Sequence, residues 1–320
     1  MAEESVKTPQ RRGDLDIARA IAAFAVVLNH IPQYFLKHDV ANFSASFGNA
    51  VIEAVRFIHI PTFMLVSGLL LAKGRNEVRS LGDYVSFERK KFLRIALPFV
   101  SITLLHLAVK LAAPGGHSQL VWDQARMSLL SPSGGLAGHL WFLYALMTIF
   151  LIWPVLAPAA RGRGVWLLEV ILLAIAVLPI NWPPAPGEAW GGPHPLFGLE
   201  ALTWYLPEFV LGYFLGSRAL DGRGGDAWAI VIALAISVAT QWGYVYADWP
   251  DGLAWVTLRR SLRMAGHMST GLLVLWVSRH IFAACRATGR LLAWVGIRSS
   301  DIYLLHVALV GHPLAFLLGQ

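Results

Sequence analysis

Charged residues are scarce in this chain of 320 residues: they make up 14% of it, against 56% for hydrophobic residues. Soluble domains carry about 25% charged residues, so the composition excludes a sizeable soluble domain. The mean hydropathy is +0.57, and the 13 Trp and 8 Tyr suit a protein with two membrane–water interfaces. We therefore expect an all-α polytopic membrane protein, a bundle of about nine to ten transmembrane helices forming one domain.

Cysteine is nearly absent. The one residue, Cys285, excludes an intramolecular disulfide and provides no metal-ligand pattern. We expect it to pack, and we expect no bound metal. The chain has 26 Lys and Arg against 19 Asp and Glu, a formal charge of +7. In a membrane protein such an excess sets the topology through the cytoplasmic loops, so we expect the lipid bilayer, and no nucleic acid, as a partner.

Internal repeats and low-complexity segments are also absent, which disfavours the inverted-repeat transporter folds. Crossing roughly 30 Å of hydrocarbon takes about 20 apolar residues. The first such run has internal charges and no clear cleavage site, so we expect a retained helix rather than a signal peptide. Residues 247–298 are ambiguous and could hold a tenth span. The nine predicted spans are 15–36, 49–72, 92–113, 138–158, 165–181, 200–217, 227–246, 262–283 and 299–318.

Lysine and arginine gather in alternate predicted loops. By the positive-inside rule the N-terminus is cytoplasmic, with residues 1–12 as a cytoplasmic tail. The rule weakens after residue 247, where Arg259 and Arg260 fall on the predicted outer side. The Pro- and Gly-rich loop 182–199 should be an irregular cap on the outer face. The basic residues of the predicted inner side are Lys7, Arg11, Arg12, Lys73, Arg75, Arg79, Arg89, Lys90, Lys91, Arg94, Arg161, Arg163, Arg218 and Arg223.

The first span, "DLDIARAIAAFAVVLNH", carries three ionisable groups in an apolar segment. Arg19 and His30 are eleven residues apart, a net rotation of about 20° and a rise of about 16 Å, so both lie on one helix face. Asp16 is three residues before Arg19, close enough for an ion pair. A structural ion pair at a helix end costs little free energy, but an imidazole deep in the membrane marks function by default. Asn29 and Pro32 suggest that the helix ends or opens beside His30.

The stretch "FERKKFLR" places a basic cluster at the start of the third span. Taken alone, it is more typical of a positive-inside anchor. Its functional reading is a phosphate clamp, because Arg forks and Lys charges match phosphate oxygens. The cluster consists of Arg89, Lys90, Lys91 and Arg94.

Further candidates lie in four short stretches, each weak by itself. In "HIPTFMLVSGLLL", Pro61 breaks helix geometry and the Ser-Gly pair allows close backbone approach. In "SSDIYLLH", Tyr303 and His306 are three apart and so share a face. Aromatic belts explain most of "GHLWFLYAL" and "WYLPEFVLGYFLG". The cavity or acceptor candidates are His59, Ser67, His139, Trp141, Glu208, Tyr303 and His306.

Together these stretches resemble the integral-membrane acyltransferase family 3. Its hallmark is a basic residue, ten residues of any kind and a His in the first span, which Arg19 and His30 match. "DIAR", "PTFMLVSGLLL", the Arg-rich start of the third span, "HLWFL", "EFVLGYFLG" and "IYLLH" are similar to its further signatures, in the usual order, from Arg12 to His306. Many members add a C-terminal extracytoplasmic hydrolase-like domain; we expect none here, since the chain ends at Gln320.

The resemblance implies an O-acyltransferase of the bacterial inner membrane that moves an acyl group, usually acetyl, from acetyl-CoA to a hydroxyl. Acceptors in the family include surface polysaccharides and other envelope molecules. The resemblance implies His30, Asp16 and Arg19 as the catalytic group, and Arg89, Lys90, Lys91 and Arg94 as the acyl-CoA site. Acyl-CoA would be a co-substrate, with no permanently bound cofactor. Polysaccharide-assembly proteins are possible partners.

The placement of the site follows from helix geometry. His30 lies roughly 22 Å beyond residue 15, past the midplane of a core of about 30 Å. We expect a polar tunnel lined by Arg19, His30 and either His59 or His306, with the acceptor near the outer face. The alternative is a cytoplasmic acceptor reached through a deep vestibule.

Two other functions remain open from the sequence. A transporter or flippase for an anionic or glycan substrate would also use intramembrane Arg, Asp and His. A non-catalytic partner of a polysaccharide synthase would tolerate the loss of His30. Whether His30 deprotonates the acceptor or first carries the acyl group is likewise open.

Overall fold

The computed structural model describes residues 12–40, 43–74, 78, 80–112, 119–130, 135–160, 162–178, 199–217, 227–247, 249–250 and 252–307. These residues form helices and no strand, as expected for an all-α protein. Four stretches are long and apolar enough to cross a membrane: Gly13–Lys37, Ala45–Lys73, Leu81–Ala112 and Gly138–Leu156. Shorter apolar helices cover Gly164–Val177 and Ile230–Tyr246. The chain therefore has the helices of a multi-pass membrane protein, while nine to ten spans stays a prediction.

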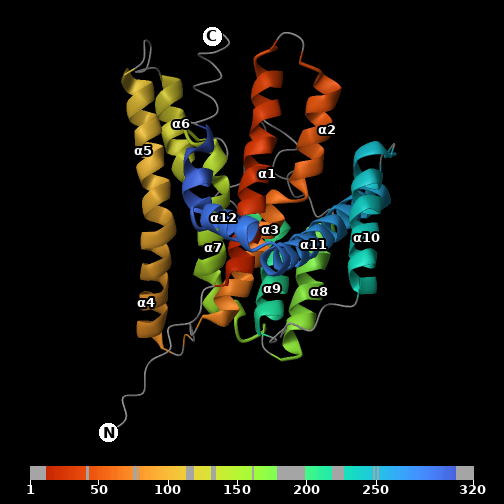
Figure 1. Ribbon diagram of the computed structural model, residues 1–320. Coiled ribbons are helices and arrows are strands. Elements are labelled where there is room, and N and C mark those ends of the chain that lie inside the picture. Colours follow the sequence, from red (N-terminus) through yellow and green to blue (C-terminus); the bar gives the residue numbers. More distant parts are fainter. Residues whose placement is uncertain are drawn as a thin grey trace.

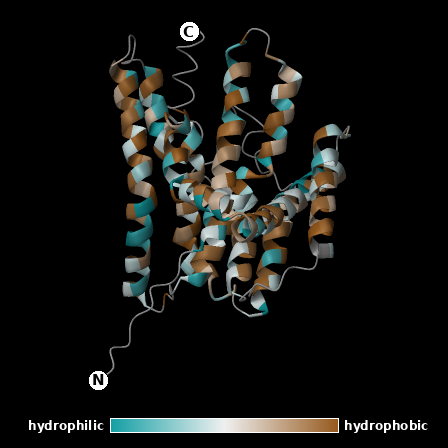
Figure 2. Ribbon diagram, in the orientation of Figure 1, coloured by the Kyte–Doolittle hydropathy of each residue, from teal (hydrophilic) through white to brown (hydrophobic). Residues whose placement is uncertain are grey.

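Most helices stand upright beside one another, and two late helices cross in front of them (Figure 1). One long rod at one edge contains α4, η1 and α5, and α10 stands at the other edge. Apolar residues dominate most of the upright helices (Figure 2). Residues 299–307 are also helical. The elements are α1 (Gly13–Lys37), α2 (Ala45–Arg56), α3 (His59–Lys73), α4 (Leu81–Lys91), η1 (Phe92–Ala96), α5 (Leu97–Ala112), α6 (Gln119–Leu130), η3 (Gly138–Leu140), α7 (Trp141–Leu156), α8 (Gly164–Val177), α9 (Leu199–Ser217), α10 (Ala227–Tyr246), α11 (Leu253–Ala284) and α12 (Arg286–Ile297).

Helix α1 is continuous, and the expected opening beside His30 is wrong. Pro32 lies inside the helix and is buried. A proline removes one backbone hydrogen bond and kinks or breaks many helices, but packing against α2, α3, α11 and α12 holds α1 together. Its Ala-rich face permits this close packing, and Gly296 of α12 lies directly on the Asp16 carbonyl, where a Cβ would approach within 1.7 Å. The shared face of Arg19 and His30 therefore persists along the helix.

The predicted span 49–72 consists of two helices, α2 and α3, which meet at Phe57 and Ile58. Pro61 explains the break, because the ring of a proline clashes with the carbonyl four residues earlier, here Phe57. In the observed fold Pro61 lies in the first turn of α3, where its missing N–H needs no partner. The break places His59 at the start of α3, in the interior of the bundle.

Helices α3 and α9 approach each other at backbone distance, which confirms the expectation drawn from the Ser-Gly pair. A Cβ on Gly68 would lie 1.9 Å from the Phe209 carbonyl oxygen, and one on Gly212 would lie 2.0 Å from that of Leu65. Small residues at such interfaces let membrane helices pack by van der Waals contact. This contact holds the Glu208 segment of α9 firmly against α3.

Other boundaries differ from the predictions. The helical rod carrying the basic cluster begins at Leu81 rather than at residue 92, and α11 begins at Leu253 rather than at residue 262. Helices α6 and α12 lie in segments predicted as loop or ambiguous. Several predictions lie outside the described residues: the loop 182–199 up to residue 198, the end of the last span, and the residues Lys7, Arg11, Arg75, Arg79, Arg161, Arg218 and Arg223.

Candidate active site

Four histidines from four distant segments form a row of imidazole rings. The His30 ring of α1 lies 4.7 Å from the His306 ring, between centroids. His306 in turn lies 5.3 Å from His139 of η3, and His139 lies 5.5 Å from His106 of α5. The structure thus brings together three predicted site residues and adds His106, which the sequence analysis did not single out.

Backbone carbonyls fix the orientation of two of these rings. The Nδ1 of His306 lies 2.7 Å from the Tyr303 carbonyl, and the Nδ1 of His106 lies 2.9 Å from the Ile102 carbonyl. A carbonyl only accepts, so both Nδ1 atoms carry the proton and both Nε2 atoms are bases in the neutral rings. The buried Nε2 atoms of His306 and His139 have no hydrogen-bond partner among the described residues. They are available to a substrate or a neighbouring imidazole.

Tyr303 ties the last helical segment to η3. Its hydroxyl donates a hydrogen bond to the His139 carbonyl, and its ring lies 5.7 Å from that of His306, which confirms that the two share a face. Phe142 packs edge-on against the Tyr303 ring at 5.4 Å. Tyr303 is 4% exposed, so it positions the two histidines from the interior.

His59 lies between this row and a second polar centre. It is within electrostatic range of His30 and His306, and of Arg56 and Arg263. Its Nδ1 accepts a hydrogen bond of 2.6 Å from the Ile60 N–H, so a neutral His59 carries its proton on Nε2. In the neutral rings, the Nε2 of His59 therefore donates a hydrogen bond, whereas the Nε2 of His306 accepts one.

The second centre is a buried pair of a carboxyl group and an imidazole. Glu208 of α9 lies 3.0 Å from the Nδ1 of His267 of α11, and both residues are 1% exposed. The His267 ring stacks on Tyr205 at 6.0 Å, and Arg263 is also 1% exposed. The sequence analysis missed His267 and Arg263; the signal was their spacing of four, which places two polar groups on one face of a helix.

The start of α1 carries an ion-pair network. Arg19 lies 3.6 Å from Asp16, which confirms the predicted pair. Asp14 pairs with Arg12 and lies 3.6 Å from Arg279 of α11. Because α1 is continuous, this network is separated from His30 by about 16 Å along the helix axis. Asp16 and Arg19 are thus at the opposite end of α1 from the imidazole row.

The predicted donor cluster lies where α4 passes into the π-helical turn η1. Arg89, Lys90 and Arg94 are exposed. Lys91 instead lies over the ring of Phe150, 4.0 Å from its centroid. Three of the four cations are therefore free to face a ligand, while Lys91 also anchors the rod to α7.

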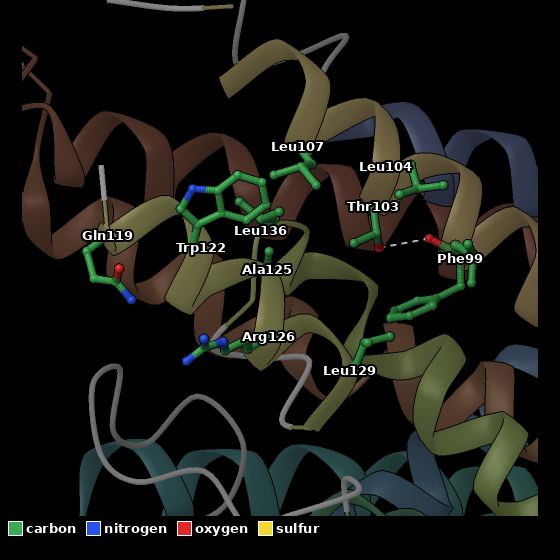
Figure 3. Close-up of a pocket in the computed structure, with 11 residues that line it drawn as sticks. Phe99, Thr103, Leu104, Leu107, Gln119, Trp122, Ala125, Arg126, Leu129 and Leu136 are labelled. Atoms are coloured by element: carbon green, nitrogen blue, oxygen red, sulfur yellow. Dashed lines mark hydrogen bonds between the residues drawn. The ribbon is translucent and has the colours of Figure 1, made fainter. Parts of the chain in front are cut away.

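Two more candidates lie nearby in the bundle. Trp141 packs on Tyr205, with 5.6 Å between ring centroids, and Ser67 is half-buried on α3. A cavity of about 430 Å³ lies between α5 and α6, lined mainly by apolar side chains with Thr103, Gln119 and Arg126 (Figure 3). None of the predicted site residues lines it, so it is distinct from the imidazole row.

Comparison with known proteins places these features in a family. The family model for an acyltransferase domain matches residues 12–318. The nodulation protein NolL of Sinorhizobium fredii (strain NBRC 101917 / NGR234) is 29% identical over 238 residues, which cover 73% of this chain and 56% of NolL. The chain thus matches little more than half the length of that curated relative. No solved structure matches. Since the family model spans nearly the whole chain, the protein belongs to the integral-membrane acyltransferase family 3.

Proposed function

We propose that this protein is a membrane O-acyltransferase that moves an acyl group, most simply acetyl, from cytoplasmic acyl-CoA to a hydroxyl of a glycan or another envelope acceptor. The observation that carries the proposal is the contact of 4.7 Å between the His30 and His306 rings. It joins two family signatures that are far apart in sequence, inside a bundle where polar groups are costly. Family membership supports the acyl-transfer chemistry.

In the proposed reaction His30 accepts the proton of the acceptor hydroxyl. The hydroxyl oxygen attacks the thioester carbonyl carbon, the C–O bond forms, and the C–S bond breaks. The proton then passes from His30 to the departing thiolate, which leaves as the CoA thiol. An imidazole suits this step because its unperturbed pKa is near 6.5, so it can both take and return a proton.

His306 supports this base. Its Nδ1–H is held by the Tyr303 carbonyl, so its Nε2 lone pair can accept a hydrogen bond from His30 when His30 is protonated. This neutral partner stabilises the transient imidazolium without a permanent buried charge. Asp16 and Arg19 would form the polar wall at the other end of α1.

The donor would bind at the α4–η1 junction. Acyl-CoA carries several phosphates, and the exposed Arg89, Lys90 and Arg94 supply matching cations. Its long pantetheine arm would carry the thioester toward His30. In this arrangement the donor phosphates and the reacting carbonyl lie at different depths in the membrane.

The experiment compares His30→Ala with His280→Ala in nanodiscs, by following CoA release from acetyl-CoA with envelope extract as acceptor. Loss of a general base lowers the rate by about 10²–10⁴-fold, whereas the exposed His280 should be replaceable. Wild-type rates in His30→Ala would refute the proposal. Acceptor transport without acyl transfer would instead favour a transporter or flippase.

The membrane geometry has its own test. We propose a cytoplasmic N-terminus, with His30 facing a space open to the outer side. Asn29→Cys and Ile31→Cys, in a Cys285→Ser background, should then react with a membrane-impermeant thiol reagent added from the periplasm. Labelling from the cytoplasm alone would favour the deep vestibule and leave the acyl transfer untouched.

A further inference from the structure

Arginines of α11 are packed on aromatic rings of two neighbouring helices. The Arg259 guanidinium carbon lies 4.9 Å from the Tyr244 ring centroid. That of Arg263 lies 5.0 Å from the Trp204 ring and 5.8 Å from the Tyr244 ring. Arg259 is exposed and Arg263 is 1% exposed, so the cations lead from the surface into the bundle.

The same helix face continues to the buried pair. Arg259, Arg263 and His267 follow one another at intervals of four residues, which places them in one stripe of α11. At its inner end the Glu208 carboxyl group and the Nδ1 of His267 share a hydrogen bond of 3.0 Å, which fixes the ring and leaves its Nε2 for a ligand. This Nε2 and the second oxygen of Glu208 are buried, with no hydrogen-bond partner among the described residues.

Membrane topology does not account for this stripe. Arg259 lies on the predicted outer side, where the positive-inside rule places few cations. Arg263 is in the interior, where a charged side chain is retained mainly for function. The donor cluster lies on α4 and η1, at the other edge of the bundle from α10 and the start of α11 (Figure 1), so it already provides a separate place for the CoA phosphates.

We propose that Arg259, Arg263 and His267, positioned by Glu208, form the subsite for an anionic group of the acceptor, which would make the acceptor a phosphate- or carboxylate-bearing glycan. This rests on the proposed function. Guanidinium groups bind carboxylate and phosphate in paired, charge-assisted hydrogen bonds. A neighbouring sugar hydroxyl, which can donate or accept, forms a hydrogen bond with the Nε2 of His267. His59, within electrostatic range of Arg263 and of His306, links this subsite to the imidazole row.

The test measures binding of glucuronic acid, glucose 1-phosphate and glucose to the full chain in phosphatidylcholine nanodiscs. Wild type should bind both anionic sugars on the order of tenfold more tightly than glucose, the effect of one charge-assisted hydrogen bond. Arg259→Gln should remove most of that preference. Because Arg259 is exposed, its replacement leaves the core intact. Binding by Arg263→Gln, which changes a buried residue, is measured in parallel. The matched control is Arg126→Gln, an exposed arginine of α6.

Equal binding of glucose and the anionic sugars by wild type would overturn the proposal. So would a loss of CoA binding in Arg259→Gln equal to its loss of sugar binding, because the stripe would then serve the donor. His30→Ala should keep the preference for anionic sugars. If wild type keeps that preference but transfers no acyl group to any extract, the proposed function fails and the anion subsite stands.

Discussion

The row of imidazoles around His30 and the stripe around His267 lie in one apolar bundle but satisfy their polar groups differently. In the row, neutral rings meet one another, and backbone carbonyls hold their Nδ1 atoms. In the stripe, the carboxyl group of Glu208 holds the imidazole, and aromatic rings pack against the arginines. The first arrangement keeps permanent charge away from the proposed base, and the second concentrates it.

This difference indicates how one bundle can provide separate environments for proton transfer and for anion binding. A group that takes and returns a proton is best surrounded by partners that favour neither state strongly. A group that binds an anion needs a fixed positive charge, which is stable in an apolar interior only when it is paired or packed on a ring. Removing residues of each centre should therefore have different consequences for stability and for rate.

The largest effect on stability should come from the charged centre. Glu208→Ala leaves a buried imidazole beside Arg263 without its hydrogen-bond partner, and a buried polar group left unsatisfied costs about 1–3 kcal/mol. Chemical denaturation in micelles measures the loss. Glu208→Gln, which keeps an acceptor oxygen, should lose less. As a control, Glu169→Leu removes a buried carboxyl that has no hydrogen-bond partner among the described residues and should cost nothing. Unchanged stability of Glu208→Ala would remove the distinction between the centres.

The neutral row should show the opposite behaviour. His306→Phe removes the Nε2 acceptor that we propose assists His30, and the transfer rate should fall by about 10²-fold, the lower end for a residue that assists proton transfer. Its stability should stay close to wild type, because the side chain loses only its hydrogen bonding to backbone carbonyls of its own helical segment. A large drop in stability with a normal rate would mean that the row is structural.

The donor cluster lies outside both centres, so its replacement should affect mainly the binding of the acyl donor. Arg94→Ala should raise the KM for acetyl-CoA about tenfold, the effect of one charge-assisted hydrogen bond to phosphate, and leave the acceptor KM unchanged. Lys91→Ala should also lower stability, since Lys91 packs on the ring of Phe150. A donor titration with unchanged KM in Arg94→Ala would reduce the cluster to a topology signal.

The smallest effect concerns the positioning of the row. Tyr303→Phe deletes the hydrogen bond to the His139 carbonyl and keeps the ring that packs on Phe142. The expected loss is about 0.5–1.5 kcal/mol of stability, with a rate reduction of severalfold. Thermal unfolding and the transfer assay measure the two. A rate loss as large as that of His306→Phe would make Tyr303 part of the chemistry.

Local chemistry made part of the site predictable. The pair of Asp16 and Arg19 and the neighbourhood of Tyr303 and His306 follow from helix periodicity, and both are confirmed. The close approach at Gly68 follows from the absence of a side chain. The roles of His106 and His267 were not predictable: nothing within α5 distinguishes His106 from a structural histidine, and the spacing of Arg263 and His267 marks a polar face of α11 without identifying the partner of either residue. Their roles depend on partners 33 and 59 residues away in sequence, His139 and Glu208.

The sequence by itself determined the class of protein, the helical state and the family, because hydropathy, periodicity and ordered short motifs are local properties of the chain. It also determined that a proline and a glycine shape α3. Only the tertiary structure decided that α1 continues past Pro32, that Pro61 opens the chain at Phe57, and which polar groups meet. Those outcomes depend on packing between helices, whose contacts compensate lost backbone hydrogen bonds and bring imidazole, carboxylate and guanidinium groups together across the bundle.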